Sequence, residues 1–142
     1  MAKEKKRKKK IKIVVATAKR KESVARARIK EGKGVIRINK RLLSAIHDPF
    51  IREVIEQPLK IAEEYIKNFD IRVNVRGGGP MGQAQAVRSA IAKGIVEYTG
   101  DEELKRTFLK IDRNFLVDDP RRVEPKKYLG RKARARFQKS YR

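Results

Sequence analysis

The residues with the clearest chemical spacing are three glycines between an alternating apolar stretch and a helical one. Gly77, Gly79 and Gly82 spell G-x-G-x-x-G, a pattern in which backbone amides bind the pyrophosphate of a dinucleotide. The rest of that site is missing. No second parallel strand, whose end would carry an acid for the ribose, is predicted after the helix, and Glu97 lies on the helix itself. The sequence therefore does not support a dinucleotide site.

The same turn has the spacing of a phosphate loop without its side chains. A phosphate loop continues with Lys and Ser or Thr, whereas Gln83 and Ala84 follow Gly82 here. Without the lysine, no side-chain charge faces the terminal phosphates of a nucleotide. We interpret the segment as a tight turn whose amides, at a helix N-terminus, remain available to a phosphate of RNA.

Composition excludes other kinds of site. The chain has no cysteine, so it forms no disulfide, thiolate zinc site or cysteine nucleophile. Its single histidine, His47, is expected on the surface and argues against a histidine metal cluster or a Ser-His-Asp triad. Asp118 and Asp119 precede Pro120 and two arginines, a pattern typical of a turn. The sequence predicts no enzyme, no metal and no cofactor.

Charge points to a polyanionic partner. The 142 residues, enough for one domain, hold 39 Lys and Arg against 17 Asp and Glu, a formal net charge of +22. Residues 1–10 carry seven of the cations and residues 121–142 carry ten, with one Glu in each stretch. Two basic ends thus flank a more ordinary domain, and nucleic acid is the usual partner of such a chain.

Targeting signals are not evident. No apolar run approaches the roughly 18 residues that span a bilayer. The lysine-rich start lacks the apolar stretch of a secretory signal. We expect a cytoplasmic protein with no membrane contact.

A strand, the glycine turn and a helix form the predicted centre, over residues 70–99. Ile71, Val73 and Val75 alternate with polar residues, which indicates a strand with one buried face. Pro80 suits the first position of a helix. Gly94 costs this helix about 1 kcal/mol relative to alanine, which predicts close packing there. The helical apolar stripe comprises Ala84, Val87, Ile91, Ile95 and Tyr98.

Three further strands are predicted before this centre. Residues 11–18 are apolar and β-branched, and the basic corner Lys19, Arg20 and Lys21 follows. Residues 24–30 alternate, with Arg26, Arg28 and Lys30 on one face. Three cations on one strand face repel each other unless anions neutralise them. Residues 31–34 contain two glycines and predict a hairpin to a returning strand at 35–39.

Helices and a tail complete the pattern. Asp48 and Pro49 predict a helix start, and Pro58 predicts a kink or two short helices. Asp101 starts a short amphipathic helix that reaches Ile111. From residue 121 onwards no core-forming pattern remains, and the tail is expected to be extended and to order in a groove of nucleic acid. Its interleaved aromatics, which could stack on a base or sugar, are Tyr128, Phe137 and Tyr141.

Three blocks of sequence carry a family resemblance: residues 19–27, residues 76–84 with 90–94, and residues 119–128 running into the tail that ends at Arg142. In order, spacing and flanking charge the chain resembles the ribosomal protein S9 family of the small (30S) subunit, in its archaeal and eukaryotic form. The resemblance implies an α/β (α+β) fold, with a four-stranded sheet, helices on one side and a left-handed βαβ crossover. This is the ribosomal S5 domain 2-like fold, followed by an extended basic C-terminal tail.

The expected organisation is a basic arm at 1–10, a globular domain at 11–117 and a tail at 118–142. The resemblance implies a structural role on 16S-type rRNA in the subunit head, beside neighbouring ribosomal proteins and without self-association. It also implies that the tail reaches the anticodon stem-loop of P-site tRNA. Charge alone allows an alternative, a generic protein that binds and compacts nucleic acid.

Two sets of residues are expected to contact RNA. The tRNA set is Lys139, Tyr141 and Arg142, where Tyr141 stands in place of a lysine found in bacterial members. The rRNA set is Lys19, Arg20, Lys21, Arg26, Arg28, Arg76, Arg88, Arg121, Arg122, Lys126, Lys127, Arg131, Lys132, Arg134 and Arg136.

Overall fold

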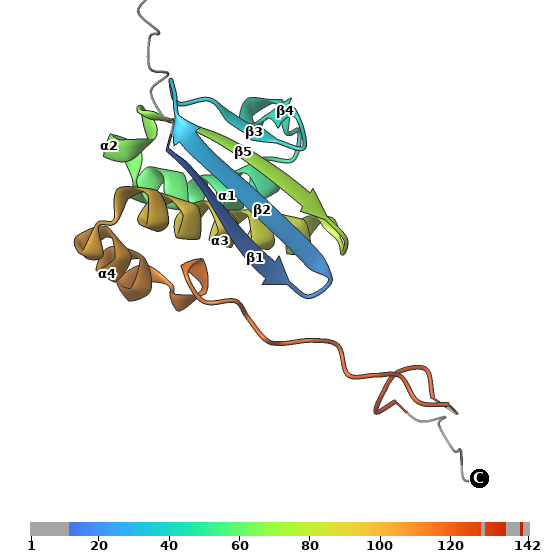
Figure 1. Ribbon diagram of the computed structural model, residues 1–142. Helices are drawn as coiled ribbons and strands as arrows, with labels where there is room; N and C mark the ends of the chain where they lie inside the picture. The colour runs from blue at the N-terminus through green and yellow to red at the C-terminus, as the bar shows by residue number, and fades with distance from the viewer. Residues whose placement is uncertain (1–11, 129, 136–139, 141–142) are drawn as a thin grey trace, which may run out of the picture.

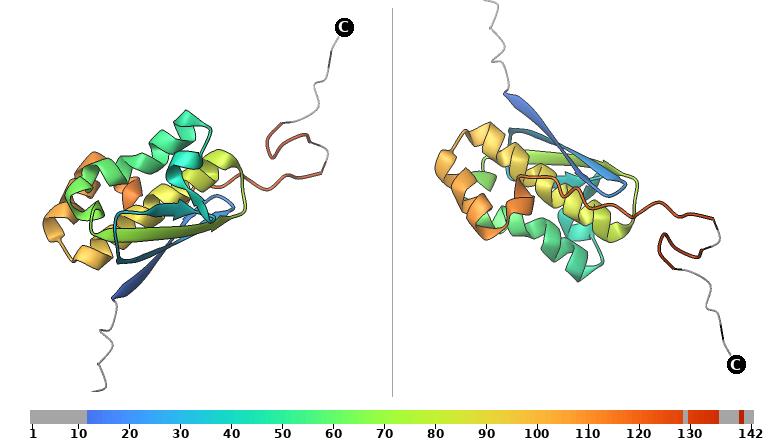
Figure 2. Two further views of the ribbon diagram at one scale, coloured as in Figure 1. Left: turned by 90° about the horizontal axis from the view of Figure 1, so that it is seen from above. Right: turned by 90° about the horizontal axis from the view of Figure 1, so that it is seen from below.

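A mixed five-stranded sheet lies at the centre of the computed structural model, which describes residues 12–128, 130–135 and 140. Helices cover one face of this sheet and leave the other open (Figures 1 and 2). The strands are β1 (Ile13–Arg20), β2 (Ser23–Glu31), β3 (Ile36–Ile38), β4 (Arg41–Leu42) and β5 (Phe69–Arg76). The helices are α1 (Pro49–Ile61), α2 (Glu63–Ile66), α3 (Pro80–Thr99) and α4 (Glu102–Ile111), with 3₁₀ turns η1 (Leu43–Ala45) and η2 (Arg113–Phe115).

The predicted hairpin at residues 31–34 is wrong. The strand order is β1-β2-β5-β3-β4, so β5 lies between β2 and β3. The turn is bound to the start of β5: Gly32 N–H donates to the Asn68 carbonyl at 3.0 Å, and Asp70 Oδ1 accepts from Lys33 N–H at 2.9 Å. β5 therefore occupies the place beside β2 that the returning strand of a hairpin would have taken. Its Ile71 is fully buried and its Val73 nearly so. The sheet also has five strands rather than four, because the short β4 pairs with β3.

The crossover from β3 to β5 is the parallel connection of the sheet. In Figure 1 the helices lie behind the sheet, β5 points to the lower right, and β3 lies on its upper right side. Figure 2 shows the same separation of strands and helices from above. A chain that leaves β3, passes through the helices behind and returns in β5 therefore turns in the left-handed sense, as the family resemblance implies.

The core lies between the covered face of the sheet and α3. Small side chains such as Ala16, Ala18 and Ala25 on β1 and β2 are buried and let the helix approach closely. A Cβ added at Gly94 would lie 2.8 Å from Ile29 Cδ1, so the predicted packing reason for this glycine is confirmed. Close packing here fixes the position of α3, and with it the polar side chains on its outer face.

The predicted helix starts are also confirmed. Asp48 accepts hydrogen bonds from Phe50 N–H at 2.9 Å and Ile51 N–H at 3.4 Å, and Pro49 begins α1. Pro58 is accommodated inside α1, and the helix ends at Ile61, about one turn after the proline. Asp101 caps α4 by accepting from Glu103 N–H at 2.9 Å.

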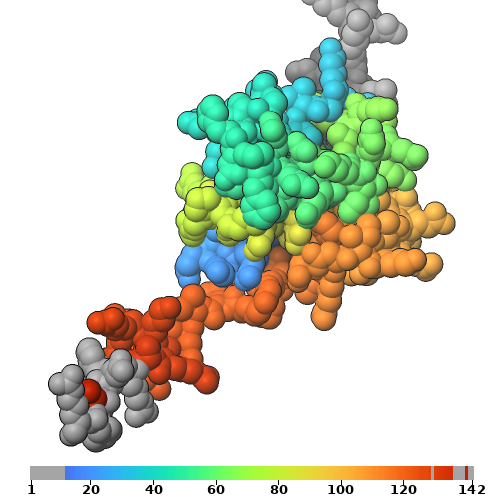
Figure 3. Space-filling model, turned by 180° about the vertical axis from the view of Figure 1, so that it is seen from behind, coloured from blue at the N-terminus to red at the C-terminus, as the bar shows by residue number. Residues whose placement is uncertain are grey.

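After η2 the described chain forms no further helix, and it leaves the domain as an extended segment. Figure 3 shows this segment extending away from the body of the molecule. Within the described residues, the helices include none that is long and apolar enough to cross a membrane.

Candidate nucleic-acid interface

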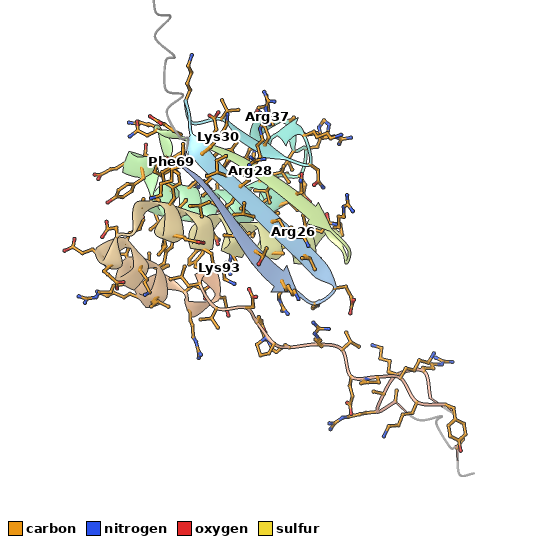
Figure 4. The ribbon with its side chains drawn as sticks, in the orientation of Figure 1. Arg26, Arg28, Lys30, Arg37, Phe69 and Lys93 are labelled. Carbon is orange, nitrogen blue, oxygen red and sulfur yellow. The ribbon has the colours of Figure 1, made fainter. Side chains whose placement is uncertain are left out.

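The open face of the sheet carries the first group of predicted RNA-binding residues. Ala25, Ala27 and Ile29 of β2 are fully buried, whereas Arg26 and Arg28 point to the opposite side and are exposed. The alternation predicted for this strand is therefore confirmed. Figure 4 shows Arg26, Arg28, Lys30 and Arg37 along this side of the sheet.

Three arginines form a row across neighbouring strands. Arg28 of β2 is the cross-strand partner of Arg72 of β5, and Arg72 is in turn the partner of Arg37 of β3. Direct partners on one sheet face lie about 5 Å apart at Cβ, where like charges are destabilising. We call Arg28, Arg72 and Arg37 the arginine row. The row therefore places three like charges side by side on the open face of the sheet.

The positive charge of the arginine row is not balanced by carboxylates of the described residues. On this face Asp70 pairs with Lys30 at 3.6 Å and also accepts backbone hydrogen bonds, which hold the pKa of its carboxyl below its usual value. Among the residues that the structure describes, no carboxylate forms an ion pair with Arg26 or with the arginine row. These guanidinium groups are free to bind phosphate, which arginine can grip with two parallel hydrogen bonds.

The row borders a groove of about 410 Å³. A second groove of about 330 Å³, bordered by Arg26 and Arg76, adjoins it. Val15, which is 57% exposed, adds an apolar wall against which a sugar can pack. The residues around the larger groove are Val15, Arg26, Arg28, Arg37, Lys40, Arg72, Val73 and Asn74.

Sequence reasoning missed Arg37, Lys40 and Arg72. Arg72 could have been found, because it alternates with buried apolar residues in the same way as Arg76. Arg37 could also have been found, because it lies between the inward-facing Ile36 and Ile38. Only its pairing with Arg72 depends on the strand order.

At the basic corner the three predicted residues differ. Lys19 and Lys21 are exposed. The Arg20 side chain is only 15% exposed, and its guanidinium donates to Gln85 Oε1 at 2.9 Å and lies 3.3 Å from Asp119. Arg20 therefore joins the end of β1 to α3 and to the segment after η2.

Arg88 does not lie on the open face. It projects from α3 on the helical side, where it donates to Gln57 Oε1 at 2.9 Å and Asp112 Oδ2 at 3.0 Å. Its guanidinium lies 4.8 Å from the ring centre of Phe115, and its side chain is 15% exposed. Intramolecular contacts thus occupy this arginine. In the sequence, its position next to the buried apolar stripe of α3 was the one indication that Arg88 faces the protein rather than RNA.

The glycine turn packs against the connection between β1 and β2. Ser23 Oγ donates to the Gly77 carbonyl at 2.9 Å, and Gln83 Nε2 donates to the same carbonyl at 3.1 Å. Gly77 has φ +79°, and a Cβ there would meet the carbonyl of Glu22. Gln83, which stands where a phosphate loop has its lysine, therefore helps to hold the turn closed.

The paired carboxylates also have basic partners. Asp118 lies 2.7 Å from Lys93 Nζ, and Asp119 lies 2.6 Å from Arg121. Hydrogen bonds from Arg121 hold the pKa of the Asp119 carboxyl far below its usual range. In the part of the chain that the structure describes, no three His, Cys, Asp or Glu residues are grouped to hold a metal ion.

The predicted tail residues within the described ranges are all exposed, and two of them, Arg121 and Arg134, form ion pairs. Arg134 lies 2.8 Å from Glu124. Arg136, Lys139, Tyr141 and Arg142 lie outside the described residues. The exposed members are Arg121, Arg122, Lys126, Lys127, Arg131, Lys132 and Arg134.

Comparison with known proteins identifies the family of this chain. The family described as ribosomal protein S9/S16 matches residues 18–142. The chain belongs to this family. Small ribosomal subunit protein uS9 of Methanothrix thermoacetophila is 50% identical over 120 residues, which cover 84% of this chain and 91% of that protein. The uS9 proteins of Thermoplasma volcanium and Methanococcus maripaludis are 48% and 45% identical, with the same coverage of both chains.

Membership confirms the resemblance drawn from the three sequence blocks. The chain is a structural ribosomal protein of the small subunit and not an enzyme. Its place is therefore the cytoplasmic ribosome, where it binds rRNA beside other ribosomal proteins.

Proposed function

We propose that the arginine row and its groove form the main rRNA-binding surface of the domain, and that the basic tail adds a second. The observation that carries the proposal is the row itself. Three neighbouring arginines lie on an open sheet face, and no carboxylate among the described residues pairs with them. Phosphates of the RNA backbone supply the missing anions, so binding relieves a repulsion that the free protein bears.

The role of this surface is positional. Guanidinium groups bind phosphate oxygens bidentately, and the exposed Val15 packs against a sugar. No bond is made or broken. The surface fixes the protein on folded RNA, and phosphate contacts of this kind set register rather than read base sequence.

The tail acts where a folded surface cannot enter. Residues 118–142 contact RNA along an extended path, and Tyr128, which is 89% exposed, can stack on a base. The last residues, Lys139, Tyr141 and Arg142, contact the anticodon stem-loop of P-site tRNA. Support for the tRNA contact comes from the family resemblance and from the extended exit of the tail (Figure 3). Residues 1–10 are proposed to be a further basic arm on rRNA.

The experiment measures affinity of the full chain for small-subunit rRNA over a range of salt concentrations. The variant R28Q/R72Q removes two charges from the row. A matched variant, R106Q/K110Q, removes two charges from exposed positions on α4. Each lost phosphate contact lowers the slope of log affinity against log salt by about 0.7 to 0.9.

We expect a lower slope and weaker binding for R28Q/R72Q, with R106Q/K110Q close to the parent protein. Equal losses in both variants would show that net charge alone drives binding, and the proposed surface would then be wrong.

A further inference from the structure

The segment after α4 is fastened to α3 before the tail departs. Ser89 Oγ donates to the Asn114 carbonyl at 2.7 Å, and Lys93 Nζ lies 2.7 Å from Asp118. The ribbon in Figure 2 shows this segment passing along α3. Figure 4 labels Lys93, the residue of α3 that pairs with Asp118 of this segment.

Three charged residues contact one another at the end of this segment. We call Arg20, Asp119 and Arg121 the tail clamp. Asp119 accepts from the Arg121 backbone N–H at 2.9 Å and binds the Arg121 guanidinium through both carboxylate oxygens. Its side chain is 10% exposed and lies 3.3 Å from Arg20. Arg20 also donates to the Arg121 carbonyl at 3.2 Å, and Arg20 and Asp119 form an isolated parallel β-bridge.

The clamp therefore grips the chain on both sides of Pro120. Proline fixes its own φ and restricts the residue before it. Backbone pairing, ion pairs and the proline ring together leave one path for the chain at this point. Beyond it the described residues form no helix or strand.

We propose that the tail clamp sets the direction in which the basic tail leaves the domain, with Asp119 as its positioning residue. The inference rests on the proposed function, because direction matters only if the tail reaches RNA. A tail that starts from a fixed point and direction has a higher effective concentration at its target than one that swivels. It also loses less conformational freedom when it binds.

On electrostatic grounds alone, a basic residue rather than an acid would be expected at position 119. Asp119 places a negative charge at the base of a tail that has ten Lys and Arg and one Glu in residues 121–142. Removing an acid beside a polyanion strengthens simple charge attraction. The clamp explains why a carboxylate stands there, and it predicts the reverse effect of removal.

The first measurement is the distance between the domain and the tail in the full chain. The sequence has no cysteine, so spin labels can be attached at R106C on α4 and K126C in the tail. We expect a narrow distance distribution in the parent protein and a broad one with D119A. The matched control is E124A, which removes the one acid of residues 121–142 and should leave the distribution narrow. Equal widths for all three proteins would overturn the inference.

The second measurement is P-site tRNA affinity of small subunits assembled with each variant. We expect D119A to weaken tRNA binding about three- to tenfold, and E124A to leave it unchanged or slightly stronger. Stronger tRNA binding with D119A would show that Asp119 acts only through its charge, and would also overturn the inference.

If D119A does not fold, D119N replaces it. Its amide oxygen can still accept from the Arg121 backbone N–H. The substitution nevertheless removes the negative charge that pairs with Arg20 and Arg121. Failure of the proposed function is visible separately. In that case subunits that lack residues 139–142 bind tRNA as well as the parent does, whatever the distance distributions show.

Discussion

Arginines of this chain occupy three environments that their sequence context does not distinguish. Arg28 lies on an open sheet face, where no carboxylate of the described chain pairs with it. Arg20 is held in the tail clamp, and Arg88 is enclosed by Gln57, Asp112 and Phe115. Sequence reasoning expected all three arginines on RNA, because charge and position along the chain were its only guides. Their separate roles arise from tertiary contacts, which join residues tens of positions apart.

Arg88 should matter for stability rather than for RNA affinity. R88A removes two hydrogen bonds and the contact with the Phe115 ring, and we expect the free energy of unfolding to fall by about 1 to 3 kcal/mol. R88K should not restore it, because a single ammonium group cannot reproduce the planar fork that reaches both partners.

Urea unfolding of the full chain measures this effect, with R28A as the comparison. R28A should leave stability unchanged or raise it, since it relieves like-charge repulsion in the arginine row. An R88A variant as stable as R28A would contradict the structural role.

Gly94 should tolerate little more than hydrogen. A Cβ there would already lie 2.8 Å from Ile29 Cδ1 and 3.4 Å from Ala16 Cβ. We expect G94V to lower the free energy of unfolding by about 1 to 3 kcal/mol through overpacking. The control is G79A, because a Cβ at Gly79 meets nothing within 4 Å. The same urea titration compares the two, and equal stabilities would show that α3 does not pack as closely as described.

At the scale of elements, local patterns in the sequence were sufficient for the strand, glycine turn and helix at residues 70–99 and for the helix caps at Asp48 and Asp101. Alternation, proline position and capping chemistry each act within a few residues. The placement of β5 between β2 and β3 was not predictable in this way. It depends on pairing between strands far apart in the chain, and the glycines at 31–34 favour a hairpin just as readily. The pairing of Arg37 with Arg72 could not be predicted for the same reason.

Acid should destabilise the fold through carboxylates at the joins between elements. Asp70 binds the turn before β3, and Asp101 caps α4 while accepting from Tyr65 Oη at 2.7 Å. Hydrogen bonds lower the pKa of both carboxyls, and that of Asp119 as well. Groups with depressed folded pKa values add stability above the unfolded pKa near 3.9, and that stability is lost as pH falls through the folded pKa. We expect a level melting temperature from about pH 5 to 8 and a decline below about pH 4.

Tyr65 gives this account a matched test at high pH. Hydrogen bonding to Asp101 raises the pKa of the Tyr65 phenol above 10.0. Its stability is therefore present below about pH 10 and is lost as pH rises through the folded pKa. Thermal unfolding of Y65F should show a smaller loss of melting temperature above pH 10 than the parent protein. An identical alkaline decline in both proteins would contradict the role of this hydrogen bond.

At the scale of the whole molecule, a folded domain with one open basic face is joined to a basic tail by a fixed exit. Family membership and the three sequence blocks agree on a ribosomal role. The concentration of charge at the two ends of the chain predicted a more ordinary domain between two basic segments. It could not predict the direction of the tail, which depends on contacts between Arg20, Asp119 and α3.

The last four residues of the tail should not be needed for assembly of the small subunit. Deletion of residues 139–142 leaves the domain, the arginine row and the tail clamp in place. We expect small subunits to assemble normally with the shortened chain and to bind P-site tRNA more weakly. Sedimentation of reconstituted subunits and a tRNA filter-binding assay measure the two effects, and failure to assemble would contradict the separation.

The measurement that tests the central claim most directly is cross-linking of the full chain to RNA in cells, with both the attached RNA and the attached peptides sequenced. The arginine row predicts that peptides containing Arg28 and Arg72 are linked to one region of small-subunit rRNA, and that tail peptides are linked to rRNA and tRNA. Cross-links that avoid the sheet peptides, or that scatter over all cellular RNA and DNA, would contradict the claim that this open face is a specific rRNA-binding surface.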